Sequence, residues 1–292
     1  METILKVKNL KKYFGRVKAI DGVSFEVEKG EILGFLGPNG AGKTTTIRCL
    51  LDFIRPSNGE IEIFGYSSRN PDFYKSRSKI GYLIAGSNLV EQWTGYDHLS
   101  YQEALHGESK IKNELIKKFS FDPKPKVKNL STGNRQKLGL IMTLMSEPEF
   151  LVMDEPTASL DPILQEEFYK IIRKLSSEGV TVFMSSHNLA EVEKVCSKVA
   201  MIKSGKLITV QKISALEGKK IHSVKITFSE KVSKDLLVDK NTEIQEEIPN
   251  GFELSVKGEM DAFIKKIAKL KIESISIMQA NLEEIFLEFY KK

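Results

Sequence analysis

Residues 37–45 read Gly-Pro-Asn-Gly-Ala-Gly-Lys-Thr-Thr and follow the pattern G-x-x-x-x-G-K-[ST]. In such a loop, backbone N–H groups wrap a triphosphate, the lysine reaches the β- and γ-phosphates, and the next hydroxyl meets Mg²⁺. The flanks fit, because 31–36 is an apolar run suited to a buried strand and 43–54 suits a helix whose positive end faces the phosphates. The alternative is a glycine-rich turn that ends in Lys-Thr by chance, which leaves the strand and helix unexplained. The residues predicted to hold a nucleoside triphosphate are Gly37, Pro38, Asn39, Gly40, Ala41, Gly42, Lys43, Thr44 and Thr45.

The composition narrows the class of protein. The chain has 292 residues, enough for one large domain or two of moderate size, and its 41% apolar and 28% charged content is ordinary for a soluble globular protein. The net charge of +5 comes from lysines and arginines along the whole chain, so no nucleic-acid partner is expected. Cys49 and Cys196 stand in apolar helical contexts without metal-ligand spacing, which predicts buried thiols.

The sequence shows neither a signal-peptide layout at its start nor a membrane span. No stretch approaches the roughly 18 consecutive apolar residues that a membrane helix needs. If the protein works at a membrane, another component is expected to anchor it.

The pattern of residues up to about 217 predicts a sheet interrupted by a helical region. Strands are expected at 4–10, 19–27 and 60–65, the first two joined by a Tyr-Phe-Gly turn, and together with the phosphate loop they are expected to make a mixed sheet. From about 85 to 148 the longer amphipathic stretches predict a mostly helical subdomain. Apolar runs at 150–153, 180–184 and 198–202, separated by helical patterns, are typical of parallel strands with crossover helices.

A composition shift near residues 215–220 predicts a second, small α+β unit over 218–292. Alternating runs at 223–228, 251–256 and 274–278 indicate half-buried strands, and 261–270 is an amphipathic helix. The last stretch, 281–290, has the apolar spacing of a further helix.

A second chemical signal is Phe150-Leu-Val-Met-Asp-Glu155. A buried strand that delivers a carboxylate at its C-terminal end suits Mg²⁺ binding beside a phosphate loop, and Asp154 fits that role together with Thr44. Glu155 comes next and could orient, or take a proton from, the water that attacks the γ-phosphate. The alternative is an ordinary Asp-Glu turn after a strand, and the presence of the phosphate loop favours the Mg²⁺ role over it.

Three motifs in chain order resemble those of the ATP-binding cassette (ABC) family. Leu130-Ser-Thr-Gly-Asn-Arg-Gln-Lys137 resembles its signature loop, usually Leu-Ser-Gly-Gly-Gln. Asp154-Glu-Pro-Thr-Ala-Ser-Leu-Asp161 resembles its Walker B motif and the D-loop that ends in Asp161, and Ser185-Ser-His187 resembles its switch-histidine segment. The resemblance covers roughly residues 1–215, so the expected domains are an ABC cassette over 1–217 and the small unit beyond it.

The resemblance implies an α/β P-loop NTPase fold with a mixed and parallel sheet, and it implies roles for further residues. Phe14, just ahead of Gly15, matches the family's adenine-stacking aromatic residue, with Tyr13 as the alternative. His187 is expected to hydrogen-bond the γ-phosphate and sense its loss, although a lone histidine is more often structural. The signature loop is expected to bind the γ-phosphate held by another cassette, so that ATP lies in a head-to-tail dimer. Its residues are Ser131, Thr132, Gly133 and Asn134.

Two positions depart from the family pattern. Thr132 adds a side chain where the family has glycine, although Asn134 keeps an amide. The family's Q-loop glutamine should follow residues 80–84, and this chain has Ala85 there. The role of a side-chain amide in binding Mg²⁺ and in coupling is therefore open, and Gln92 is not assigned to it.

The resemblance extends to the ATP-binding subunits of ABC-2-type exporters, including drug- and antibiotic-resistance systems. It implies an ATPase that uses ATP and Mg²⁺, works as a homodimer or paired cassette, and drives a separate transmembrane permease at the cytoplasmic face of the membrane. The permease is expected to dock near 85–96, where Trp93 and Tyr96 could be anchors or, equally, local core packing. Two alternatives stay open: a cytosolic non-transport ABC ATPase and a regulatory nucleotide-binding module.

Overall fold

The computed structural model describes residues 2–83, 89–217 and 221–279. The chain divides into two compact units, Met1–Gln211 and Lys212–Lys292, a few residues before the boundary expected after 217. The stretch expected to form a last helix, 281–290, and Ala85 both lie outside the described residues.

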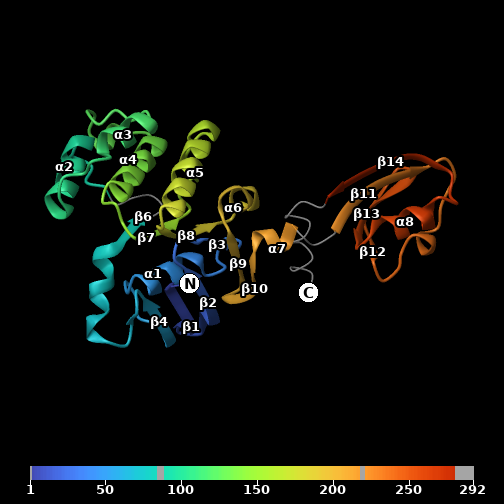
Figure 1. Ribbon diagram of the computed structural model, residues 1–292, viewed down its shortest axis with the longest axis horizontal. Helices are drawn as coiled ribbons and strands as arrows, with labels where there is room; N and C mark the ends of the chain where they lie inside the picture. The colour runs from blue at the N-terminus through green and yellow to red at the C-terminus, as the bar shows by residue number, and fades with distance from the viewer. Residues whose placement is uncertain (1, 84–88, 218–220, 280–292) are drawn as a thin grey trace. The chain divides into compact units, whose positions relative to one another are not determined.

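The first unit contains most of the helices and strands (Figure 1). Its strands are β1 Thr3–Phe14, β2 Val17–Glu28, β3 Ile32–Leu36, β4 Asn58–Ile63, β5 Tyr66–Ser67, β6 Ile80–Leu83, β7 Phe150–Asp154, β8 Thr181–Ser186, β9 Lys198–Lys203 and β10 Lys206–Lys212. Its α-helices are α1 Lys43–Leu50, α2 Gly95–His106, α3 Lys112–Lys118, α4 Thr132–Leu144, α5 Pro162–Ser177 and α6 Leu189–Val195. Short 3-10 helices span Pro71–Lys79 and Val127–Asn129.

The central sheet has six strands in the order β10-β9-β3-β8-β7-β6. Strand β3 pairs in parallel with β8 and β9, and β7 pairs in parallel with β6 and β8. Every residue of β3, β7 and β8 is buried, as expected for a parallel sheet covered on both faces. This confirms the predicted parallel strands, and it brings the carboxyl ends of β3, β7 and β8 to one edge.

The strands at the front of the chain form a separate sheet, which corrects the prediction that they join the phosphate loop in one mixed sheet. Its order is β2-β1-β4-β5, and each neighbouring pair is antiparallel. Strand β3 is apolar or glycine at all positions and enters the central sheet, whereas β2 alternates buried and exposed residues and covers only one face. Strands β1 and β2 are joined by a turn at Gly15, and β1 already includes the expected turn residues Tyr13 and Phe14.

One hydrophobic core joins the two sheets and α1. The rings of Phe25, Phe35 and Phe183 meet there at centroid distances of 5.6, 5.8 and 5.3 Å. Ile47 of α1 and Cys49 are buried in the same cluster. The free thiols of Cys49 and Cys196 are both buried, as predicted.

The helices α2, α3 and α4 lie together at the β6 edge of the central sheet, as Figure 1 shows. Helix α2 begins with a capping box, in which the Thr94 hydroxyl accepts from the Asp97 N–H and the Asp97 carboxylate accepts from the Thr94 N–H. Among the described residues, no helix is both long enough and apolar enough to cross a membrane.

The second unit has one antiparallel sheet, in the order β12-β13-β11-β14, and helix α8 Met260–Ile267. The strands are β11 Ile221–Phe228, β12 Thr242–Ile248, β13 Gly251–Lys257 and β14 Ile272–Gln279. Short helices span Ile213–Glu217, labelled α7, and Lys234–Leu236. Phe263 and Ile267 of α8 are buried in one cluster with the apolar residues of β11 and β13. Strand β12 was not predicted, because its run of glutamates gives it little apolar pattern.

Candidate functional site

The loop between β3 and α1 is held by close backbone packing. A Cβ atom at Gly37 would lie 2.4 Å from the Ile202 carbonyl oxygen, and one at Gly42 would lie 2.6 Å from that of Ala19. Gly42 also has a φ of +111°, which side chains rarely adopt, and it caps the start of α1. Only glycine fits these two positions, so the loop can lie flat against β9 and β2.

A pocket of about 440 Å³ opens over this loop. Seven of the nine predicted loop residues line it, whereas Gly37 and Ala41 pack behind the loop. The lining residues are Val17, Lys18, Ala19, Pro38, Asn39, Gly40, Gly42, Lys43, Thr44, Thr45, Glu155, Ser204 and Gly205.

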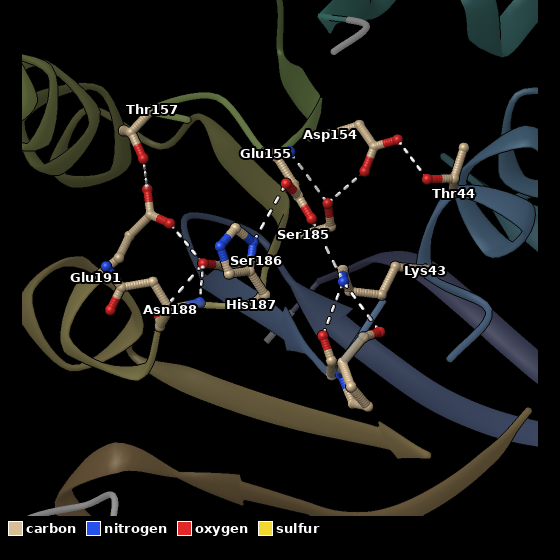
Figure 2. Close-up of polar contacts among 12 residues, drawn as sticks. Lys43, Thr44, Asp154, Glu155, Thr157, Ser185, Ser186, His187, Asn188 and Glu191 are labelled. Atoms are coloured by element: carbon tan, nitrogen blue, oxygen red, sulfur yellow. Dashed lines mark hydrogen bonds and ion pairs between the residues drawn. The ribbon is translucent and has the colours of Figure 1, made fainter. Parts of the chain in front are cut away.

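Lys43 supplies a buried positive charge at the pocket floor. Its side chain is only 5% exposed, and its ammonium donates to the carbonyl oxygens of Gly37 at 2.7 Å and Pro38 at 3.3 Å. The third neighbour is Glu155, whose Oε1 lies 3.4 Å from Lys43 Nζ (Figure 2). An ammonium has three donors, so these contacts fix it above the loop.

Asp154, at the end of β7, lies opposite the start of α1. Its Oδ2 accepts the Thr44 hydroxyl at 2.8 Å, and its Oδ1 accepts the Ser185 hydroxyl at 2.5 Å. The Ser185 oxygen in turn accepts the Glu155 N–H at 3.1 Å. Ser185, near the end of β8, therefore fixes both acidic residues. The sequence places it in the switch-histidine segment but does not show that its hydroxyl meets Asp154.

Glu155 occupies the centre of the polar cluster that Figure 2 draws. One carboxylate oxygen faces Lys43, and the other lies 3.2 Å from Nδ1 of His187. Its backbone φ is +48°, in the left-handed region that non-glycine residues seldom adopt. Such strained residues persist where the surroundings hold them and cluster at functional sites. The arrangement can orient a polar group between Glu155, His187 and Lys43.

The donor set around Asp154 fits Mg²⁺. Mg²⁺ prefers oxygen ligands and usually keeps one or two protein ligands together with substrate phosphates and waters. Thr44 and Asp154 offer a hydroxyl and a carboxylate side by side. The described residues hold no cluster of three or more histidine, cysteine or acidic side chains suited to binding a metal without a substrate.

The predicted signature loop lies at the start of α4, outside the residues that line the pocket. The Ser131 hydroxyl caps this helix by accepting the Asn134 N–H at 3.3 Å, and Thr132 is the first helical residue. A Cβ at Gly133 would lie 2.9 Å from the carbonyl oxygen of Ser159. The loop thus packs on the segment that follows Glu155.

Asp154 and His187 lie beside Glu155 but do not line the pocket, and Asp161 and Phe14 lie apart from it. Asp161 caps α5, where its carboxylate accepts the N–H groups of Ile163 and Leu164 at 3.1 and 3.0 Å. Phe14 ends β1 with a half-exposed ring, and the Lys12 ammonium lies 4.9 Å from the centre of that ring. Residues 17–19, at the start of β2, line the pocket instead, together with Ser204 and Gly205 from the turn between β9 and β10. Both stretches were missed because only folding brings them beside the loop.

Comparisons with known proteins give this geometry its context. Residues 20–158 match the profile of the ABC transporter family. The chain is 33% identical to the bacitracin transport ATP-binding protein BcrA of Bacillus licheniformis, over 99% of this chain and 96% of that protein.

Two solved structures share the fold. One, an ATP-binding subunit of an ABC transporter, is 26% identical, has a TM-score of 0.67, and is matched over 73% of this chain and 92% of its own. The other is a dimeric ATP-binding cassette bound to ADP and Pi, with a TM-score of 0.65 over 72% of this chain and 99% of its own. At 22% identity, the second likeness shows the fold alone.

These likenesses confirm the predicted fold class and the predicted ATPase activity. The phosphate loop, the acidic strand end and the relative matched over nearly its full length all indicate an ATPase subunit. The chain belongs to the ABC transporter family and is the ATP-binding, ATP-hydrolysing subunit of such a transporter.

Proposed function

We propose that this chain powers an exporter whose transmembrane permease is a separate chain, and that it works at the cytoplasmic face of the membrane. The observation that carries the proposal is the match to a bacitracin transport ATP-binding protein along nearly the full length of both chains. That match includes the second unit, beyond the cassette. No described helix could span a membrane, which agrees with a separate permease.

In the proposed cycle, the triphosphate of ATP lies over the loop 37–45 and Phe14 stacks on the adenine. Lys43 binds the β- and γ-phosphates, and bound Mg²⁺, held by Thr44 and Asp154, supplies charge that stabilises the leaving phosphates. Glu155 orients the attacking water. These roles agree with the buried ammonium, the hydroxyl beside a carboxylate, and the acid at the pocket edge.

A change of partner for Lys43 starts the reaction. In the structure Glu155 contacts both Lys43 and His187. A γ-phosphate carries more negative charge than a carboxylate and competes with Glu155 for the ammonium. Glu155, released from Lys43 but still beside His187, is then free to accept a hydrogen bond from water.

The signature loop acts on the nucleotide of a second cassette. Ser131 and Gly133 stand at the N-terminal end of the thirteen-residue helix α4, where N–H groups and the helix dipole favour an anion. ATP between the two cassettes therefore stabilises the closed pair. Closure moves the permease, and hydrolysis reopens the pair, because only the triphosphate contacts both cassettes.

The permease docks on the exposed aromatic surface of α2. The Trp93 ring packs on His98 and Tyr101, at centroid distances of 5.1 and 5.6 Å, so Trp93 takes part in local packing. Tyr96, Tyr101 and Leu105 are exposed, and the last two lie one turn apart on the same face. Aromatic residues of this kind dominate interface energetics.

Copurification tests this function. The tagged chain, expressed in its native host and purified from detergent-solubilised membranes, is expected to carry a transmembrane protein at a fixed ratio. Leu105→Asp is expected to lose the partner while keeping ATPase activity, and Asn113→Asp, an exposed change on α3, is the control. Recovery only from the cytosol, without a membrane partner, contradicts the transport role and favours a non-transport ABC ATPase or a regulatory module.

A further inference from the structure

Glu191, on the first turn of α6, is a buried acid next to the proposed hydrolysis site. Its side chain is 3% exposed. Each carboxylate oxygen accepts one hydroxyl: Oε1 that of Thr157 at 2.6 Å, and Oε2 that of Ser186 at 2.6 Å (Figure 2). One side chain therefore joins two segments that lie about thirty residues apart in the sequence.

The burial of this carboxylate is costly. Burial raises the pKa of Glu191 above its usual value, while the hydroxyls of Ser186 and Thr157 oppose that rise. A buried polar group that loses its partner costs free energy, so the pair of short hydrogen bonds strongly favours one geometry of the two hydroxyls. Burial of the carboxylate therefore lowers the stability of the fold, while its two hydrogen bonds fix the positions of the Thr157 and Ser186 hydroxyls.

Thr157 belongs to the segment that follows Glu155. This segment makes further polar contacts, because Gln136 of α4 donates to the Pro156 carbonyl at 2.7 Å and Gln165 of α5 donates to the Leu160 carbonyl at 3.2 Å. The segment also packs against Gly133, through the Ser159 carbonyl. Its position thus determines where Glu155 and the signature loop stand relative to each other.

Ser186 immediately precedes His187. Its oxygen accepts the Asn188 N–H at 2.9 Å, so the turn that carries His187 folds around the same hydroxyl that Glu191 binds. Glu155 lies two residues before Thr157, and His187 directly follows Ser186, so the residues that Glu191 joins are close in sequence to the two side chains that meet at 3.2 Å.

We propose that Glu191 is a positioning residue for ATP hydrolysis. It holds the 156–161 segment against the turn that carries His187 and so keeps the side chains of Glu155 and His187 in contact. The inference rests on the proposed roles of these two residues. Glu191 acts only through Thr157 and Ser186.

The test compares Glu191→Ala and Glu191→Gln with Glu193→Gln, an exposed change on the same helix. Three readouts are measured on the purified full chain: kcat and KM for MgATP, melting temperature, and hydrogen–deuterium exchange of peptides covering 154–161 and 185–190. Glu191→Ala is expected to lower kcat roughly tenfold to a hundredfold, as small misplacements of reacting groups do, with KM within about twofold. Exchange is expected to rise in both peptides.

Glutamine separates positioning from simple core packing. It keeps the size of the side chain and one acceptor oxygen, and its amide N–H can donate to the second hydroxyl. Glu191→Gln is therefore expected to recover a large part of kcat and of the exchange protection. Glu193→Gln is expected to match the parent protein in all three readouts.

Several outcomes would overturn the inference. It fails if Glu191→Ala keeps kcat within twofold, if exchange in the two peptides is unchanged, or if the loss falls on KM alone. Should Glu191→Ala not fold, Thr157→Val and Ser186→Ala must each lower kcat, and normal turnover in both removes Glu191 from this role. If the parent protein shows no hydrolysis that Lys43→Ala abolishes, the proposed function fails, and the exchange data alone decide whether Glu191 holds the two segments.

Discussion

The two units of the chain differ in what they bury. Among the described residues of the first unit, the buried side chains include an ammonium and two carboxylates, those of Lys43, Asp154 and Glu191. The buried polar side chains described in the second unit are the hydroxyls of Thr242 and Ser255. Its acids and bases pair at the surface, as Lys265 does with Asp261.

The contrast indicates that the buried charges of the first unit serve function and the apolar core of the second unit serves stability. A buried charge costs free energy unless partners satisfy it, so several buried charges in one unit indicate a functional role for them. Surface ion pairs contribute little, and an apolar core supplies most of a domain's stability. We therefore expect changes in the first unit to act on turnover and changes in the second to act on its own unfolding.

The largest effect is expected from Lys43→Ala. Loss of the buried ammonium removes a charge aimed at the phosphates, so ATP hydrolysis should fall by at least about a thousandfold. The measurement is phosphate release under saturating MgATP, with the exposed Lys75→Ala as the control. Hydrolysis within tenfold of the parent would show that the buried charge serves stability alone.

Glu155→Gln is expected to slow turnover by about a hundredfold while ATP still binds, because a general base is lost and the charge on Lys43 is kept. An ATP-bound dimer should then accumulate, visible by size-exclusion chromatography with light scattering. Glu178→Gln, at the exposed end of α5, should behave like the parent protein. Near-normal turnover removes Glu155 from the catalytic role.

A smaller effect is expected in the second unit from Ile226→Val. Ile226 is fully buried, and the loss of one methylene should cost about 1 kcal/mol of unfolding free energy, with the ATPase unchanged. Ile275, which faces Ile226 across β11 and β14 and is 38% exposed, gives a matched control in Ile275→Val. Equal losses of unfolding free energy at both positions, or a loss of ATPase turnover, would contradict the proposed difference between the two units.

The smallest effect is expected from Asp239→Asn. The hydrogen bond from Lys266, at 2.6 Å, is the main cause that lowers the pKa of Asp239, but the carboxylate is 42% exposed and solvent screens it. The pair should therefore contribute at most about 0.5 kcal/mol at pH 7. A carboxyl group whose pKa is lower in the folded than in the unfolded protein stabilises the fold at pH values above its unfolded pKa of about 3.9. This contribution is lost as the pH falls through the folded pKa.

Urea unfolding of the parent and of Asp239→Asn at pH 7 and in acid checks this sign. The difference between them should shrink steadily below pH 3.9. The more exposed pair of Lys265 and Asp261 is the control, and Asp261→Asn should show no difference at either pH. A difference that grows in acid contradicts the assignment.

The sequence alone determined the local elements whose pattern is strong. The glycine-lysine run between an apolar strand and a helix predicted a phosphate loop, and the structure has β3 and α1 on its two sides. The parallel strands β7, β8 and β9 were predicted within a few residues, because their apolar runs are short and clearly bounded. Such features depend on residues close together in the chain, and periodicity encodes them directly.

Only the tertiary structure decided which distant residues meet. The Ser185 hydroxyl reaches Asp154 across 31 positions, and Glu191 reaches Thr157 across 34. The separate front sheet and the pocket lining from Ser204 were likewise absent from the local pattern. The physical reason is that strand order and the packing of turns are set by the burial of whole faces against one another, and no short stretch of sequence carries that information.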